Sequence, residues 1–308
     1  MKKIFLLVSV FSLVMITGCS EKSDNVAAYS GDEIRIKANI GAVTRAQILE
    51  LDDDLSVEFA RVDGEFENYS EGETLTGTVA KLNNELTFTG ENNKYPAAKG
   101  TVNLIGWYPR IASEEAFDKA AGKVTLNVDG ETDVMFTNLV HGSSDERITS
   151  ITFNHVLSYA TIKASFETGA AAEWGTITSV TLEDITGDYE FTLPTEGSTP
   201  INPGVLINGP AEDLVLTPAN TITEEEAVVV GEALFVPSTS LKITVASASK
   251  SGSVVVSKSF IASTSYAITI KIDKEVLIPI VITNASSPIG VWTSGGEVNG
   301  GTLNPDVD

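Results

Sequence analysis

Apolar and polar residues alternate along many segments of this chain, and this alternation is the feature that most constrains its fold. In residues 34–40 every second residue is apolar, so that Ile34, Ile36, Ala38 and Ile40 form one face. Side chains of a β-strand point to opposite faces in turn, so the pattern predicts a half-buried strand. Similar alternation or short apolar runs predict strands over residues 102–108, 124–128, 148–153, 160–166, 189–193, 228–236, 241–245, 254–260 and 266–272.

Turn-forming residues separate these segments at short intervals. Glycine adopts positive φ without strain and Asp or Asn initiates turns, so their pairs mark connections between strands. Such pairs occur at residues 63–64, 129–130, 187–188, 208–210 and 251–252. Only residues 113–121 have a helical pattern, with two glutamates in the first turn. We therefore predict an all-β protein with one short helix.

Length and one polar break predict two domains. A chain of 308 residues is long enough for two domains of ~130 residues each. Residues 141–147 are polar and contain glycine and serine between two apolar stretches, as linkers do. We place the boundary there, which gives an N-terminal domain at 46–145 and a C-terminal domain at 146–308. The frequent short strands favour a β-sandwich.

The first residues resemble a lipoprotein signal peptide. Lys2 and Lys3 precede an apolar run at 4–17, which is shorter than the ~20 residues of a membrane span. The run leads into Gly18 and Cys19, the only cysteine of the chain. We expect residues 1–18 to be removed and Cys19 to be lipidated, which would anchor the chain in a membrane. The alternatives are an ordinary signal peptide with a chance cysteine, or a buried cysteine.

Composition disfavours several classes of function. A formal charge of −22 argues against nucleic acid as a partner and against a polybasic membrane anchor. One cysteine and two histidines exclude a disulfide framework and a Cys-rich or three-histidine metal site. No nucleophile elbow, phosphate-binding loop or dinucleotide fingerprint occurs, although a glycosidase carboxylate pair would be hidden among 42 acidic residues. We predict that the protein is not an enzyme and has no cofactor.

Aromatic residues leave a second function open. Trp107, Tyr108 and Trp292 could stack on sugar rings if they were exposed, and the chain would then be a surface lipoprotein that binds host or dietary glycans. Packing in the core is the ordinary alternative for each tryptophan.

A protease site is predicted directly after the first alternating strand. Arg45 lies between that strand and an acidic stretch, and the small residue Ala46 follows it. A trypsin-like or gingipain-like protease needs a reachable guanidinium followed by a small residue. Arg35 lies inside the predicted strand and should be protected. An ordinary loop arginine is the alternative reading of Arg45.

The combination of these features resembles the fimbrillin superfamily, whose members build type V pili. The resemblance is carried by the lipobox at Cys19, the strand before Arg45, the block 153–162 around His155, and the closing segment 266–272 with the later Trp292. It implies two tandem transthyretin-like β-sandwich domains. It also implies that His155 packs in the fold rather than acting as a catalyst.

The resemblance further implies a mode of assembly. The lipoprotein precursor would reach the outer membrane, where a protease would cut after Arg45 and remove residues 19–45. A strand from another pilus subunit would then fill the vacated groove, a form of β-augmentation. The protein would be a structural and adhesive subunit, located on the outer membrane and then in the fimbrium, with a host glycan or protein as a further possible partner.

Removal of the first strand would be costly enough to require a replacement. Losing the three isoleucines Ile34, Ile36 and Ile40 from a core would cost roughly 5–9 kcal/mol, whereas a domain is stable by only ~5–15 kcal/mol. Ile278, Ile280 and Ile282 lie in an apolar segment that is one candidate for the donor strand.

The alternative is that residues 276–282 form an internal strand and that the donor begins at Val291. The tail after Trp292 is rich in glycine, which leaves stalk, tip and anchor positions open.

Overall fold

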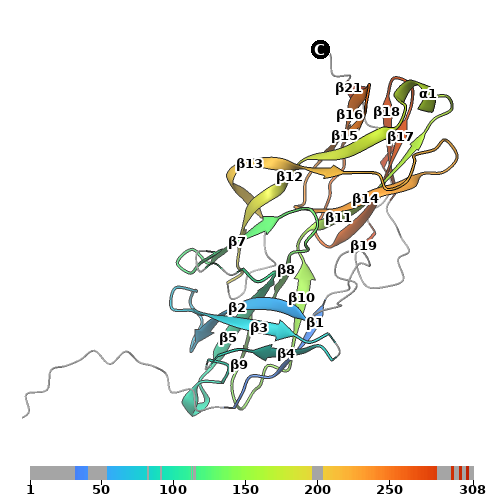
Figure 1. Cartoon of the computed structure of the whole chain (residues 1–308). Coiled ribbons are helices and arrows are strands. Elements are labelled where there is room, and N and C mark those ends of the chain that lie inside the picture. Colours follow the sequence, from blue (N-terminus) through green and yellow to red (C-terminus); the bar gives the residue numbers. More distant parts are fainter. Residues whose placement is uncertain are drawn as a thin grey trace, which may run out of the picture.

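The computed structural model describes residues 32–40, residues 54–195 except 82, 91, 112, 114 and 115, residues 204–282, and three two-residue strands. These strands are β19 (Thr293–Ser294), β20 (Val298–Asn299) and β21 (Leu303–Asn304). Within the described residues, helix is limited to α1 (Ala171–Trp174), the 3-10 turn η1 (Ala97–Lys99) and a 3-10 residue at Ala116. The all-β prediction is therefore confirmed (Figure 1).

The first sheet contains the strands of the N-terminal part and closes on itself. Its order is β2 (Leu55–Asp63), β3 (Glu73–Val79), β4 (Glu85–Phe88), β1 (Ile36–Ile40), β10 (Ser150–His155), β8 (Met135–Thr137), β5 (Val102–Tyr108) and β9 (Val140–Gly142). Because β2 also pairs with β5, seven of these strands, all but β9, form a ring. The closed ring leaves β1 with a neighbour on both sides.

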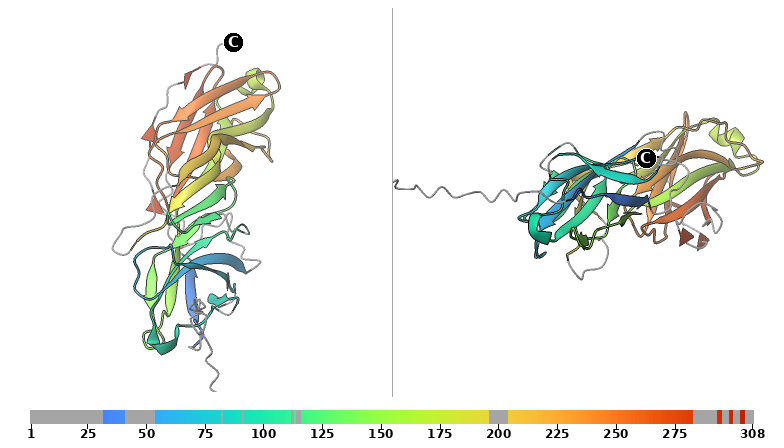
Figure 2. Two further views of the ribbon diagram at one scale, coloured as in Figure 1. Left: turned by 90° about the vertical axis from the view of Figure 1, so that its left-hand side faces the viewer. Right: turned by 90° about the horizontal axis from the view of Figure 1, so that it is seen from below.

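Two further sheets form the other part of the molecule. The second has the order β14 (Val228–Phe235), β11 (Ser158–Phe166), β17 (Thr264–Ile272), β18 (Leu277–Ile282) and β20, with β19 beside β17. The third has the order β21, β16 (Ser251–Val256), β15 (Leu241–Ser247), β12 (Ile177–Thr192), β7 (Lys123–Val128) and β6 (Phe117–Asp118), with β13 (Val205–Leu216) beside β12. Figure 2 shows the resulting elongated molecule from two more directions.

Three hydrophobic clusters connect these sheets. One fills the interior of the ring and includes Phe59 and Phe153. The second lies where the first and third sheets meet, around Trp107 and Phe191. The third fills the space between the second and third sheets and includes Trp174. Each part of the molecule thus has an apolar interior of its own, and the second cluster lies between the two.

Several elements differ from the sequence prediction. The helix predicted at 113–121 is wrong, because Phe117–Asp118 form β6, which pairs with β7 and buries Phe117. Strands β2, β3, β4, β8, β9 and β13 were not predicted, and β9 includes the first two residues of the predicted polar break. The boundary between residues 145 and 146 and the transthyretin-like sandwiches stay predictions. Two sheets contain strands from both sides of that boundary. β10 follows the boundary but lies in the first sheet, and β7 precedes it but lies in the third.

Gly106 offers a direct test of packing inside the ring. It lies opposite Phe59 in the β2–β5 pair, and a Cβ atom at position 106 would lie 2.4 Å from the ring of Phe59. We expect Gly106→Ala to destabilise the protein by about 1–3 kcal/mol, because overpacked cores must shift. Denaturant unfolding measures this loss. Gly252→Ala is the control, since its nearest atom would lie at 3.3 Å, and an equal loss there would contradict the explanation.

Candidate functional site

The first predicted strand is an interior strand of the closed sheet. β1 runs antiparallel to β4, with Ile36 opposite Leu86, and parallel to β10, with Ala38 opposite Ile151. Figure 1 shows β1 beside β10 in the lower part of the molecule. We call residues 32–40 the leader strand, and the space that they fill between β4 and β10 the leader groove.

Alternation in the sequence decides which leader side chains enter the core. Ile34, Ile36 and Ala38 are 1%, 2% and 0% exposed, whereas Arg35 and Lys37 point to solvent. Ile40 pairs with Phe153 through its backbone, and its side chain lies outside the described residues. The leader strand therefore completes the apolar interior of the ring. That it can be removed stays a prediction.

Backbone hydrogen bonds tie the leader strand to both walls of the groove. On one side, Ile34 N donates to Asn93 O at 2.8 Å, and Tyr95 N donates to Asp32 O at 3.0 Å. On the other, Lys37 N donates to Thr149 O at 3.0 Å. An ion pair joins Asp32 to Arg147. Any strand that replaces the leader must supply similar backbone partners.

A hollow of about 530 Å³ lies along the outward face of the leader strand. It is lined by the leader residues Arg35, Ile36 and Lys37, by Asn83 and Glu85 on the β4 side, and by Thr149 on the β10 side. Arg35 forms a 2.9 Å ion pair with Glu33, and this contact raises the pKa of the Arg35 guanidinium. The leader strand is thus buried on its inner face and open on its outer face.

The predicted lipidation and cleavage residues lie outside the described part of the chain. Cys19, Arg45 and Ala46 are not among the described residues, and neither is Trp292. The lipid anchor and the protease site stay predictions.

The segment proposed as donor forms β18. It pairs antiparallel with β17 over six positions, from Ile272 opposite Leu277 to Ala267 opposite Ile282. Ile278 is 39% exposed, and β18 also pairs with β20. The donor role of Ile278, Ile280 and Ile282 stays a prediction beside the alternative that the donor begins at Val291.

The structure corrects the glycan hypothesis at one residue. Trp107 is fully buried in the cluster between the first and third sheets, so it cannot stack on a sugar. Tyr108 is partly buried, and this burial raises the pKa of its hydroxyl. Trp174 is also buried, and its indole NH donates to Asp273 O at 2.7 Å. Two of the three tryptophans therefore serve packing.

Sequence reasoning placed His155 in the packing of the fold but missed the polar contacts that support the ring. His155 contacts Asp133 through its Nδ1 atom, and both side chains are 3% exposed. Arg61 and Tyr95, each 1% exposed, hold the loop 92–95 beside the leader strand. An arginine within the apolar strand β2 was the only signal for this arrangement. Nothing in the sequence indicated Asp133.

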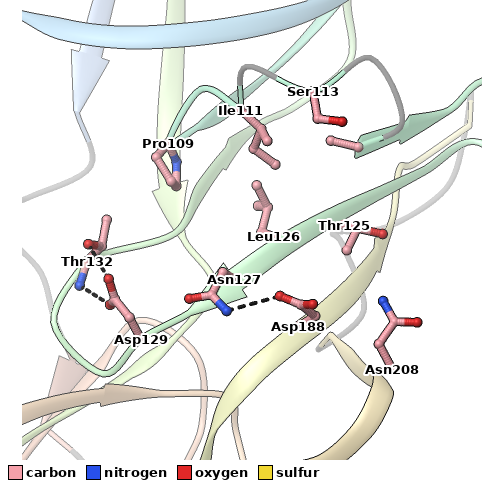
Figure 3. Close-up of a pocket in the computed structure, with 11 residues that line it drawn as sticks. Pro109, Ile111, Ser113, Thr125, Leu126, Asn127, Asp129, Thr132, Asp188 and Asn208 are labelled. Atoms are coloured by element: carbon pink, nitrogen blue, oxygen red, sulfur yellow. Dashed lines mark hydrogen bonds between the residues drawn. The ribbon is translucent and has the colours of Figure 1, made fainter.

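A second hollow of about 540 Å³ lies near the loop before β6 and the end of β7 (Figure 3). Asn127 donates to Asp188 at 3.0 Å, and Asp129 accepts hydrogen bonds from Glu131 N and Thr132. Those hydrogen bonds lower the pKa of Asp129, although its partial burial acts in the opposite direction. The charged groups are thus satisfied locally.

No group of three His, Cys, Asp or Glu side chains among the described residues could hold a metal ion. No helix in that part of the chain has the length and apolar character to cross a bilayer.

Comparison with known proteins places the chain in a family. The sequence model of the fimbrillin-like family matches residues 44–292. No curated protein matches the sequence. A proposed cell adhesion protein from Bacteroides ovatus is similar in structure, with 14% identity, a TM-score of 0.55 and coverage of 85% of this chain and 98% of its own. A second, from Bacteroides uniformis, has 18% identity, a TM-score of 0.54 and coverage of 85% and 99%.

At these identities the structural likeness concerns the fold alone. The sequence match, in contrast, spans most of the chain. Together with an all-β fold whose first strand lies inside a closed sheet, it shows that this chain belongs to the fimbrillin-like family.

Proposed function

We propose that this chain is a structural, adhesive pilus subunit that assembles by strand exchange in the leader groove. The family membership supports a place at the cell surface or in a fimbrium, with other pilus subunits as partners. The two similar structures are both described as proposed cell adhesion proteins, which agrees with an adhesive rather than an enzymatic role.

One observation carries the proposal: an N-terminal strand supplies an interior position of a closed ring. Burial of Ile34 and Ile36 contributes about 1.5–3 kcal/mol each, so their loss alone would cost roughly 3–6 kcal/mol. Loss of the leader would also expose the edges of β4 and β10 at the same time. Unpaired edges of this kind readily pair with a strand from another chain.

The positions of the two ends favour an open polymer. β1 lies in the lower part of the molecule in Figure 1, whereas β18 and β21 lie in the upper part. A donor from one end that enters a groove at the other gives a head-to-tail contact, and such contacts propagate into filaments when they do not close into rings.

The donor strand is proposed to come from the C-terminal segment, either from residues 276–282 or from the tail that begins at Val291. A donor that used Ile278, Ile280 and Ile282 would have to give up the six β17–β18 pairs, whereas one that began at Val291 would not.

Export and maturation form the earlier steps of the proposal. Lipidation of Cys19 would bring the chain to the outer membrane, and a trypsin-like or gingipain-like protease would cut between Arg45 and Ala46. The match to the family model begins at residue 44, next to the proposed cut.

Cleavage and assembly can be tested together. We expect the protease-treated protein to begin at Ala46 and to form a heat-labile ladder of oligomers, and we expect Arg45→Ala to abolish both. N-terminal sequencing, intact mass and gel electrophoresis provide the readouts. Arg35→Ala is the matched control and should leave both unchanged, because hydrogen bonds of Ile34 and Lys37 hold the backbone on either side of Arg35. An Arg45→Ala protein that still polymerised would contradict the proposal.

A further inference from the structure

The two walls of the leader groove are connected to each other on the core side of the leader strand. One wall consists of β4 and the loop 92–95, and the other consists of residues 147–153. Tyr95, on the first wall, is 1% exposed, and its hydroxyl accepts a hydrogen bond from Ile148 N on the second wall at 2.9 Å. Tyr95 and Ile148 also belong to the same hydrophobic cluster as Ile34 and Ile36. The side chain of Tyr95 therefore spans the groove.

The loop that carries Tyr95 is held from inside the ring by Arg61 on β2. The Arg61 guanidinium donates from Nη1 to Lys94 O at 2.8 Å and also to Asn92 O. Its Nε and Nη2 atoms bind both carboxylate oxygens of Asp63, at 2.7 and 3.1 Å. Arg61 is 1% exposed, and a paired guanidinium of this kind fixes the geometry of its partners. The position of the loop is therefore set by β2 as well as by the leader strand.

None of these bonds uses an atom of the leader strand. The leader contacts the same loop through Ile34 N to Asn93 O and through Tyr95 N to Asp32 O. Its departure would remove those two bonds. It would leave in place the bonds of Arg61 and the bond between the Tyr95 hydroxyl and Ile148 N.

An empty groove would need such a connection to stay usable. Neighbouring strands lie about 4.8 Å apart, so β4 and β10 would be left about 10 Å apart without the leader, too far to pair. Apolar walls and unpaired edges favour closure of such a gap. A rigid side chain fixed at both ends opposes that closure.

We propose that Tyr95, held by Arg61, is a strut that keeps the leader groove at the width of one strand after the leader has gone. Tyr95 is then a positioning residue for the incoming donor strand. This inference rests on the proposed function, because it concerns the same groove in its emptied state.

The test uses the full chain, cut after Arg45 once folded and freed of its leader. The probe is a labelled synthetic peptide with the sequence of residues 32–40. We expect Tyr95→Phe to weaken peptide binding about three- to tenfold, as for the loss of one buried hydrogen bond. We also expect exchange of the Ile148 amide hydrogen to stay slow in the emptied parent protein and to become fast in the variant. Because the exchange measurement on the parent protein needs no substitution, it decides the question even if the variant folds poorly.

Tyr69→Phe is the matched control. Tyr69 is buried in the cluster between the first and third sheets and donates from its hydroxyl to Pro194 O, so it loses a similar bond away from the groove. It should bind the peptide as the parent does. The strut would be overturned if the Ile148 amide exchanged fast in the emptied parent protein, or if the parent did not bind the peptide. It would also be overturned if Tyr95→Phe bound the peptide as the parent does, or if Tyr69→Phe weakened binding equally. Expected peptide binding without any polymer would overturn the proposed function alone.

Discussion

Replacing Ile36 with aspartate is expected to release the leader strand from its groove without any cleavage. The Ile36 side chain is 2% exposed inside the ring, so Ile36→Asp loses its burial and places a carboxylate among apolar side chains. The two effects together amount to about 5 kcal/mol or more. This approaches the whole stability of a typical domain, ~5–15 kcal/mol. Hydrogen exchange over residues 32–40 and denaturant unfolding would measure the release.

The neighbouring position Asn39 offers the matched control. Its side chain is exposed, so Asn39→Asp introduces the same acidic group on the outward face of the same strand. We expect a change within about 0.5 kcal/mol. If Ile36→Asp left the amides of residues 32–40 as well protected as Asn39→Asp does, burial of the leader strand would not be what holds it.

The second large effect is expected at the end of β10. His155→Leu removes the partner of Asp133, whose side chain is 3% exposed. The second carboxylate oxygen of Asp133, Oδ1, has no hydrogen-bond partner in the described part of the chain. Breaking a buried pair by removing one member costs about 3–5 kcal/mol, because the other member stays buried without compensation. Denaturant unfolding with an unchanged m-value would measure this loss as a shift of the midpoint.

A double substitution separates this explanation from simple loss of packing. With both members replaced, as in His155→Leu with Asp133→Leu, no buried polar group is left unpaired, and stability should recover by several kcal/mol. If the stability losses of the two single variants simply added in the double variant, the histidine would contribute through its packing alone. Either result bears on a wall of the leader groove, since β10 is the strand beside β1.

Local patterns were reliable where the environment of a strand alternates between core and solvent. The segment 102–108 was predicted with the bounds that β5 has, and the burial of Ile34, Ile36 and Ala38 follows the alternation of the sequence. The pattern failed at β13, where both faces are largely exposed, and at 113–121, where pairing with β7 overrides a weak helical preference.

The sequence predicted the inward face of the leader strand but not the walls of the leader groove. Which leader residues face inward depends on the period of a strand, but which segments form the walls depends on contacts between distant residues. Lys37 pairs with Glu85 and with Ser150, which are far from it in sequence and from each other. The position of Trp107 was equally unpredictable, because a tryptophan can either stack on a sugar ring at the surface or pack in a core.

The sequence by itself determined that this protein is built of strands and which face of each alternating strand is apolar, because both properties depend on neighbouring residues alone. Only the tertiary structure decided that the first strand closes a ring between β4 and β10, and that Arg61, Tyr95 and the pair of Asp133 and His155 support that ring from within. These contacts join residues separated by long stretches of chain. Their energies arise only when folding brings buried polar groups together and removes them from water.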